Sequence, residues 1–351
     1  MNLVELARQL IDIPSITGDE LEVGRFLASY LERLRYHVEL QEISPGRANL
    51  IATTSNLPRL VLSTHMDTVP PHISSSEDEE YIYGRGSCDA KGIIAAQILA
   101  AEKLRGDGLD EIGLLFTVDE EAGSDGARAA NNHPAASSCR FLINGEPTEN
   151  KLALGTKGSL RLRLKATGRA AHSAYPELGE SAIEKLLDVL NDIRNCTWPA
   201  DDSLGNTTCN IGTIKGGVRP NVIAEYAEAD LQIRLTTAAP PVKQMLEKIV
   251  DGRALVGYLS VSEPVKLLAV EGFETCVVRF TTDIPHLTNW GTPLLLGPGS
   301  IHDAHTPHER VSKPELAEAV ICYERLARTL LTSTNQQAQD QKEKAEGAGE
   351  T

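Results

Sequence analysis

The sequence predicts an α/β domain that is interrupted by a smaller α+β insertion. In residues 1–156, short apolar runs typical of buried strands alternate with segments that have helical spacing of apolar residues. In residues 157–267, the predicted strands alternate apolar and polar residues, which is typical of a sheet with one solvated face. The first pattern returns over residues 268–333, so the two outer segments are expected to form one discontinuous domain.

Length and composition exclude several classes of protein. The 351 residues agree with two domains, and the net charge of −15 disfavours nucleic acid because it repels phosphate groups. No run of about 18 apolar residues occurs, so no membrane span is expected. The N-terminal segment carries Glu5 and Asp12 within its apolar pattern, unlike a signal peptide. The six cysteines are scattered without a C-x-x-C pair, and a cytoplasmic protein with reduced thiols is predicted.

The first part of the α/β domain is predicted to alternate between helices and strands. Thr17 or Asp19 could cap the second helix. Helices are predicted over residues 3–11, 21–34, 91–104 and 123–131, the third of them amphipathic. Strands are predicted over residues 37–42, 49–53, 60–63, 113–118 and 141–144.

The insertion is predicted to have the order β-α-β-β-α-β of a ferredoxin-like domain. Its strands include residues 160–165, 229–235 and 256–261, and its helices residues 181–193 and 240–250. A helix over 271–282, a strand over 293–296 and a helix over 314–331 are expected to complete the α/β domain. Residues 334–351 contain almost no large apolar side chains and are expected to be disordered.

Acidic and histidine side chains follow the predicted strands of the α/β domain. Ligands of such sheets lie beyond the carboxyl ends of the strands, so these side chains are expected to converge there. A histidine from the later loop, which holds His302, His305 and His308, could join them. The group comprises His65, Asp67, Asp89, Asp119, Glu120, Glu121 and Glu146.

This combination favours a metal site. Several carboxylates in one place repel one another unless cations neutralise them, and two bridged divalent ions would do so. Mixed histidine and carboxylate ligands favour zinc, cobalt or manganese over magnesium. A further glutamate could remove a proton from the bridging water. Taken singly, an H-x-D motif or a pair of glutamates is better explained as packed or solvated residues, so the prediction depends on their ordered combination.

Six segments resemble the M20 family of metallopeptidases and deacylases, in the family's order and over nearly the whole chain except its tail. They are S-T-H-M-D-T-V-P, G-R-G-S-C-D-A-K-G, F-T-V-D-E-E-A-G-S-D-G, N-G-E-P-T, A-H-S-A-Y-P and G-P-G-S-I-H-D-A-H-T-P-H-E. The resemblance implies a zinc-peptidase-like catalytic domain with a mainly parallel central sheet. It also implies an inserted lid or dimerisation domain, a homodimer formed through it, and two divalent metal ions, with zinc favoured and cobalt the alternative.

The resemblance assigns roles to individual residues of the α/β domain. Glu120 corresponds to the general base, and Asp67 to the acid that orients a ligand histidine. His305 is favoured over His302 and His308 because Thr306-Pro307-x-Glu309 follows it, and Cys88 is interpreted as a packed thiol. The bond from Asp89 to Ala90 is expected to be cis. The residues that correspond to metal ligands are His65, Asp89 as the bridging carboxylate, Glu121, Glu146 and His305.

Three residues of the insertion correspond to substrate-binding positions. His172 matches a donor that stabilises the tetrahedral oxyanion across a dimer interface. Asn221 and Arg234 match residues that bind the substrate, with the arginine taking a free carboxylate. On spacing alone, His172 would be a buried histidine that caps a loop, and Arg234 a solvated strand residue.

The resemblance implies hydrolysis of an amide bond in a small N-acyl amino acid or dipeptide. An acetylornithine or acetyl-lysine deacetylase of amino-acid biosynthesis is favoured. A succinyl-diaminopimelate desuccinylase, a dipeptidase or carboxypeptidase and a carrier-linked lysine hydrolase are the alternatives. From other classes, a non-catalytic relative that binds metal or a partner and a two-metal phosphoesterase stay open. The phosphoesterase would need Arg85, Lys91 or Lys157 to bind phosphate near the ligands.

Overall fold

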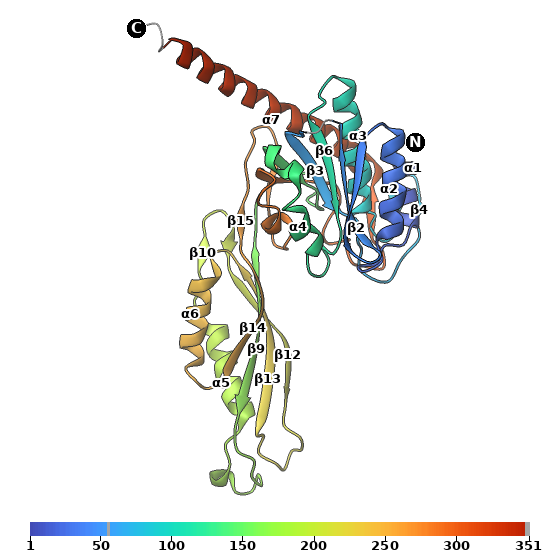
Figure 1. The fold of residues 1–351 in the computed structure, drawn as a ribbon. Helices are drawn as coiled ribbons and strands as arrows, with labels where there is room; N and C mark the ends of the chain where they lie inside the picture. The colour runs from blue at the N-terminus through green and yellow to red at the C-terminus, as the bar shows by residue number, and fades with distance from the viewer. Residues whose placement is uncertain (55–56, 348–351) are drawn as a thin grey trace. The chain divides into compact units, whose positions relative to one another are not determined.

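The computed structural model describes residues 1–54 and 57–347, with residues 333–347 described by their backbone alone. The chain forms two compact units, which Figure 1 displays as a ribbon. Unit 1 comprises Met1–Ala153, Leu267–Cys276 and Thr282–Thr351, and unit 2 comprises Leu154–Lys266 and Val277–Thr281. The chain passes between the units four times: within β8 (Leu152–Thr156), between Lys266 and Leu267, within β16 (Thr275–Val278), and between Thr281 and Thr282.

Unit 1 is built around a six-stranded mixed sheet with the strand order β1-β2-β6-β3-β7-β17. The neighbours β6, β3, β7 and β17 are parallel, whereas β1 and β2 are antiparallel to each other and β2 is antiparallel to β6. The prediction of a mainly parallel sheet is therefore correct for β6, β3, β7 and β17 but not for β1 and β2. The strands are β1 (His37–Ser44), β2 (Arg47–Thr53), β3 (Leu60–His65), β6 (Ile112–Thr117), β7 (Phe141–Asn144) and β17 (Thr292–Leu295).

Helices bury both faces of this sheet, which explains the continuous apolar runs of its strands. Leu60 and Leu62 pack into a core with α1 (Leu3–Asp12), α2 (Leu21–Arg33), α3 (Lys91–Gly106) and α7 (Lys313–Gly347). Val61 points to the opposite face and packs with α4 (Asp125–Ala130) and Trp290. The helix α3 was predicted to be amphipathic, but α1 and α7 both contact it, and most of its side chains are buried.

Three predictions for unit 1 are wrong. Neither Thr17 nor Asp19 caps α2, whose N-cap is Glu20. The predicted helix over residues 271–282 is replaced by extended chain that includes β16, because Thr275, Val277 and Val278 are β-branched and favour a strand. The helix α7 continues to Gly347, although 334–351 was predicted to be disordered. This segment is rich in Gln, Ala, Lys and Glu, which are good helix formers even without apolar residues. Residues 348–351 lie outside the described part of the chain.

Unit 2 contains a four-stranded antiparallel sheet with the order β12-β13-β9-β14. Two helices cover one face of it (Figure 1), and Leu160, Leu162 and Leu164 point into the core between them. The predicted order β-α-β-β-α-β is confirmed by β9 (Gly158–Thr167), α5 (Ala182–Asn195), β12 (Thr208–Gly216), β13 (Tyr226–Leu235), α6 (Ala239–Val250) and β14 (Leu255–Ser262).

Short elements complete the two units. In unit 1 they are β4 (Ser76–Glu77), β5 (Tyr81–Tyr83), β18 (Arg310–Ser312) and the 3-10 helices Pro134–Ser138 and Ile284–His286. In unit 2 they are β10 (Ala200–Asp201), β11 (Gly205–Asn206), β15 (Val265–Lys266) and the 3-10 helix Pro176–Leu178. Among the residues that the structure describes, no helix is both long enough and apolar enough to cross a bilayer.

Candidate metal centre and active site

The topology of unit 1 brings the ends of three strands to one edge of the sheet. His65 is the last residue of β3 and pairs with Thr117 at the end of β6. On the other side, Ser63 pairs with Asn144, the last residue of β7. The segments that follow β6 and β7 carry the predicted glutamates, so strand order alone places them beside His65.

Asp89 lies between the two predicted histidine ligands. Its Oδ1 is 3.0 Å from Nε2 of His65, and its Oδ2 is 3.2 Å from Nε2 of His305. The same His305 nitrogen is 2.8 Å from Oε1 of Glu121. His65, Asp89 and Glu121 each offer a ligand atom, and these atoms lie within 4.8 Å of one another. The structure therefore brings together four of the five predicted ligands, which come from distant parts of the sequence.

These contacts shift the protonation of the cluster. Hydrogen bonds to Asp89 and Glu121 raise the pKa of His305 to about 10. Burial opposes the effect at Asp89, but its contacts with His305 and His65 hold the pKa of this carboxyl below its usual value. Asp89 is therefore a carboxylate that is already arranged between two cationic rings, and a bound cation could replace the protons on those rings.

Glu146 supplies an independent test of the metal assignment. Its side chain is buried, and its Oε1 has no hydrogen-bond partner among the described residues. Burial, with the charges of Asp89 and Glu121, raises its pKa. A buried carboxylate oxygen without a donor is unfavourable unless a cation compensates it. The donor set of His65, Asp89, Glu121, Glu146 and His305 thus fits divalent metal ions.

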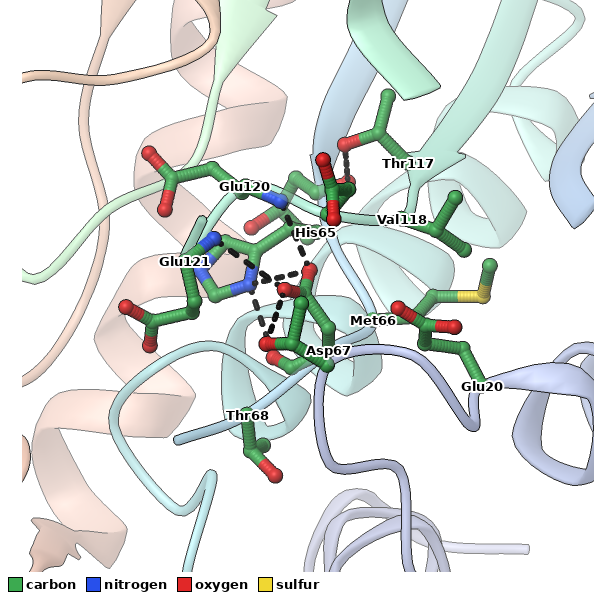
Figure 2. Close-up of polar contacts among 12 residues, drawn as sticks. Glu20, His65, Met66, Asp67, Thr68, Thr117, Val118, Glu120 and Glu121 are labelled. Atoms are coloured by element: carbon green, nitrogen blue, oxygen red, sulfur yellow. Dashed lines mark hydrogen bonds and ion pairs between the residues drawn. The ribbon is translucent and has the colours of Figure 1, made fainter. Parts of the chain in front are cut away.

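Asp67 organises the loop that carries Glu120 and Glu121. Figure 2 shows its carboxylate at the centre of a hydrogen-bond network, with the carboxylates of Glu120 and Glu121 directed away from it. It accepts hydrogen bonds from the backbone N–H groups of Glu120 at 3.1 Å and Glu121 at 3.2 Å, and from Thr17 Oγ1 at 2.9 Å. His65 Nδ1 lies closer to the backbone oxygen of Asp67, at 2.9 Å, than to its carboxylate, at 3.5 Å. Asp67 therefore positions both the ring and the loop.

Glu120 follows Asp119 in the loop that Asp67 organises, and its side chain is half-buried. Burial and the nearby charge of Glu146 raise its pKa, which makes the carboxylate a stronger proton acceptor. The preceding Asp119 was a candidate from sequence but has a structural role. Its carboxylate accepts from Arg47 at 2.8 Å and from the backbone N–H of Asp125 at 3.2 Å, so it shapes the turn that presents Glu120.

Glu309 is a positioning residue that sequence reasoning noted only as part of a motif. Its Oε1 accepts hydrogen bonds from the backbone N–H groups of Gly86 at 2.9 Å, Asp89 at 3.2 Å and Cys88 at 3.3 Å. Its Oε2 accepts from Arg85 at 2.6 Å. One buried carboxylate thus fixes the loop that holds Asp89. The predicted cis bond from Asp89 to Ala90 is present.

Asp283 is a second acid that the sequence reading missed. It is buried near the cluster, and its Oδ2 accepts a hydrogen bond from Thr117 Oγ1 at 2.7 Å. Burial raises its pKa to about 6, and its charge in turn raises the pKa of Glu120 and Glu146. Asp283 belongs to none of the quoted motifs and immediately precedes the 3-10 helix Ile284–His286, so only the tertiary fold brings it here.

Several other residues of unit 1 are committed to structural contacts. Cys88 is fully buried, and burial raises the pKa of its thiol, in agreement with a packed rather than a ligating side chain. Arg85 pairs with Glu309, and Lys91 Nζ donates to the backbone oxygen of Ile13 at 2.5 Å. These two cations were the phosphate-binding candidates in unit 1, and both are engaged elsewhere.

Unit 2 brings His172 and Asn221 together. An isolated antiparallel β-bridge joins His172 and Val222, and the backbone N–H of Ser173 donates to the backbone oxygen of Asn221 at 3.1 Å. Both side chains are exposed, so His172 is not the buried histidine that spacing alone suggested. Arg234 lies on β13, is half-buried, and lines a separate cavity of unit 2.

Comparison with known proteins identifies the family. The model of peptidase family M20/M25/M40 matches residues 61–329. A peptidase M20 domain-containing protein of Schizosaccharomyces pombe is 38% identical over 336 residues, covering 93% of this chain and 84% of that protein. A probable carboxypeptidase of Aspergillus terreus is 38% identical over 365 residues, covering 91% of this chain and 84% of that protein. The chain belongs to peptidase family M20. It is a metal-dependent hydrolase.

Solved structures share the fold. Aminopeptidase PepT of Bacillus cereus superposes with a TM-score of 0.76 at 21% identity, covering 92% of this chain and 96% of that one. The YXEP protein of Bacillus subtilis, described as a dinuclear metal-binding peptidase of the M20 family, gives a TM-score of 0.69 at 15% identity, covering 94% and 98%. At these identities, the likeness supports the α/β fold of the family.

Proposed function

We propose that this chain hydrolyses the amide bond of an N-acyl amino acid or short peptide that has a free α-carboxylate, with two divalent metal ions as cofactors. The observation that carries the proposal is the convergence of His65, Asp89, Glu121 and His305 beside the unsatisfied buried oxygen of Glu146. Zinc is favoured because the donors mix imidazole and carboxylate, with cobalt as the alternative. A dinuclear site in the YXEP protein supports the number of ions.

The residues that would hold the ions are His65, Asp89, Glu121, Glu146 and His305, and Asp89 would be the carboxylate that both ions share. When bound, such ions lower the pKa of a water molecule and polarise the amide carbonyl. The chain supplies the proton transfers. Glu120, whose pKa is raised by burial, takes the proton of the attacking water and passes it to the leaving amine. Asp67 holds the Glu120 backbone in place for this exchange.

Unit 2 contributes the substrate contacts in this proposal. His172 donates a hydrogen bond to the developing oxyanion, and Asn221 and Arg234 bind the substrate, with the guanidinium pairing with the free carboxylate. The exposure of His172 and the position of Arg234 on a cavity wall support these roles. A lid or dimerisation role of unit 2, a homodimer formed through it and a cytoplasmic location belong to the same proposal.

Curated relatives named probable carboxypeptidases support a substrate with a free carboxyl terminus. Acetylornithine and acetyl-lysine, succinyl-diaminopimelate, dipeptides and carrier-linked lysine are the members of this class to compare. A phosphoesterase is less well supported, because Arg85 and Lys91 are engaged in other contacts.

A substrate panel and one substitution test the proposal. Acetylated, succinylated and dipeptide substrates are assayed after chelation and after zinc or cobalt is added back. We expect turnover to disappear on chelation and return with metal. In Glu120→Gln, we expect bound metal to be retained and kcat to fall by about 10²–10⁴-fold. Near-normal turnover of this variant would remove Glu120 from its role, and no hydrolysis of any amide would overturn the proposed reaction.

A further inference from the structure

The loop that carries Glu120 and Glu121 is anchored at both of its ends by one buried carboxylate, that of Asp283. Thr117 is the last residue of β6 and precedes the loop, and its Oγ1 donates to Oδ2 of Asp283 at 2.7 Å. Ser124 is the N-cap of α4, where the loop ends, and its hydroxyl group also interacts with this carboxylate. Asp283 lies 166 positions after Thr117 in the sequence, so it ties the loop to a distant segment of unit 1.

Asp283 and Asp67 act on different parts of this loop. Asp67 accepts hydrogen bonds from two backbone N–H groups in the middle of the loop, whereas Asp283 contacts its two ends. Thr117 also pairs with His65 in the sheet, so the anchor acts on the strand end that presents this histidine as well. The positions of two proposed metal ligands, His65 and Glu121, therefore depend on the contact between Asp283 and Thr117.

The negative charge of Asp283 is not needed for this anchor, because a neutral amide oxygen can accept the same hydrogen bond. Asp283 is only 2% exposed, and its Oδ1 has no hydrogen-bond partner among the described residues. Its charge raises the pKa of Glu120 and of Glu146, so the three acids repel one another. A buried charge in such surroundings destabilises the metal-free protein, and it is expected where a bound cation compensates it.

We infer that Asp283 is a positioning residue of the metal centre, which anchors the loop after β6 through Thr117 and whose negative charge strengthens the binding of the divalent cations. The inference rests on the proposed function, in which two such cations are bound, and it adds to that function a residue outside the ligand set. An acid with a purely structural role would stabilise the protein with or without metal. Asp283 should instead stabilise the metal-bound protein and destabilise the metal-free one.

Two substitutions separate the charge of Asp283 from its hydrogen bond. Asp283→Asn removes the charge and keeps an oxygen that can accept from Thr117. Thr117→Val keeps the branched shape of the side chain and the charge of Asp283, but it removes the hydroxyl donor. Asp107→Asn is the matched control, because Asp107 is exposed and lies at the opposite end of α3 from Asp89, and the 16 residues of this helix span about 24 Å.

Each metal-stripped protein is titrated with Zn²⁺ by calorimetry and, in a separate experiment without metal, unfolded with urea at pH 8. We expect Asp283→Asn to weaken zinc binding by about 10–100-fold and Thr117→Val by about tenfold, since residues that orient metal ligands have effects of this size. In urea, Asp283→Asn should unfold at a higher concentration than the wild type, because it removes an uncompensated buried charge. Asp107→Asn should leave the zinc affinity unchanged.

The outcomes separate the possible failures. Weaker zinc binding together with higher metal-free stability in Asp283→Asn supports the inference, because loss of a purely structural contact could not produce both. Unchanged zinc affinity in Asp283→Asn or in Thr117→Val overturns it, as does an Asp283→Asn protein that is less stable than the wild type without metal. If the wild type binds zinc with the help of Asp283 but hydrolyses no amide of the substrate panel, the proposed function fails and the role of Asp283 in metal binding stands.

Discussion

Replacing Glu309 by glutamine removes the charge that holds the Asp89 loop to Arg85. Both side chains are almost fully buried, with 0% of Glu309 and 3% of Arg85 exposed, and their atoms are 2.6 Å apart. If the new amide keeps its oxygen towards Gly86 and Asp89, its NH2 group faces the guanidinium, and Arg85 becomes an uncompensated buried charge. Breaking a buried pair in this way costs about 3–5 kcal/mol.

The opposite orientation of the amide is no more favourable in free energy. It would turn the NH2 group towards the three backbone N–H groups that Oε1 now accepts from. Each buried donor left without an acceptor costs about 1–3 kcal/mol. We therefore expect Glu309→Gln to lower the free energy of unfolding of unit 1 by at least about 3 kcal/mol. Because the Asp89 backbone is released, metal affinity should also fall by about 10–100-fold.

Urea unfolding of the metal-free protein measures this loss. Trp290 is buried in unit 1 and Trp198 lies in unit 2, so a Trp198→Phe background reports unit 1 by fluorescence. Glu22→Gln is the control, because its pair with Arg25 is exposed and such pairs contribute about 0–1 kcal/mol. A loss for Glu309→Gln no larger than that for Glu22→Gln would refute the reasoning.

Three further substitutions test other parts of the site. Asp67→Asn replaces an acceptor of the Glu120 N–H by an amide, so kcat should fall by about 10–100-fold in steady-state assays, and an unchanged kcat would contradict the role of Asp67. Burial raises the pKa of Asp283 to about 6, so the stability it contributes to the metal-free protein is full below about pH 4 and is lost as the pH rises through 6. Asp283→Asn should therefore stabilise that protein by on the order of 2–3 kcal/mol at pH 8 but not at pH 4 in urea titrations, and equal effects at both pH values would argue against it. Gly145→Ala would place a Cβ 2.6 Å from Gln97 Nε2 and should cost about 1–3 kcal/mol in thermal unfolding, whereas full stability would show that the packing there is loose.

Much of the fold could be predicted because the burial of a strand on one or both faces determines the hydropathy pattern of its sequence. The apolar runs at residues 60–63, 113–118 and 141–144 are buried on both faces, and the alternation at 160–165 reflects a sheet with one covered face. The helix predicted over 271–282 was wrong because a few apolar residues fit either period. The C-terminal part of α7 was not predicted because the low apolar content of residues 334–351 was given more importance than their helix propensity.

The candidate site was predictable where a residue stands beside a strand end or within a motif. His65, Asp89, Glu121 and His305 meet in the structure as the sequence reading required. Asp283 could not be found in this way, because no local pattern distinguishes it from a solvated acid.

Calorimetric titration of the metal-stripped protein with zinc tests the central claim most directly, namely that distant side chains form one site for two cations. The wild type should bind two equivalents, and Asp89→Asn, which alters the carboxylate proposed to serve both ions, should weaken the binding of both by at least about tenfold. A wild-type protein that binds fewer than two zinc ions, or an Asp89→Asn variant that binds both with unchanged affinity, would contradict the account.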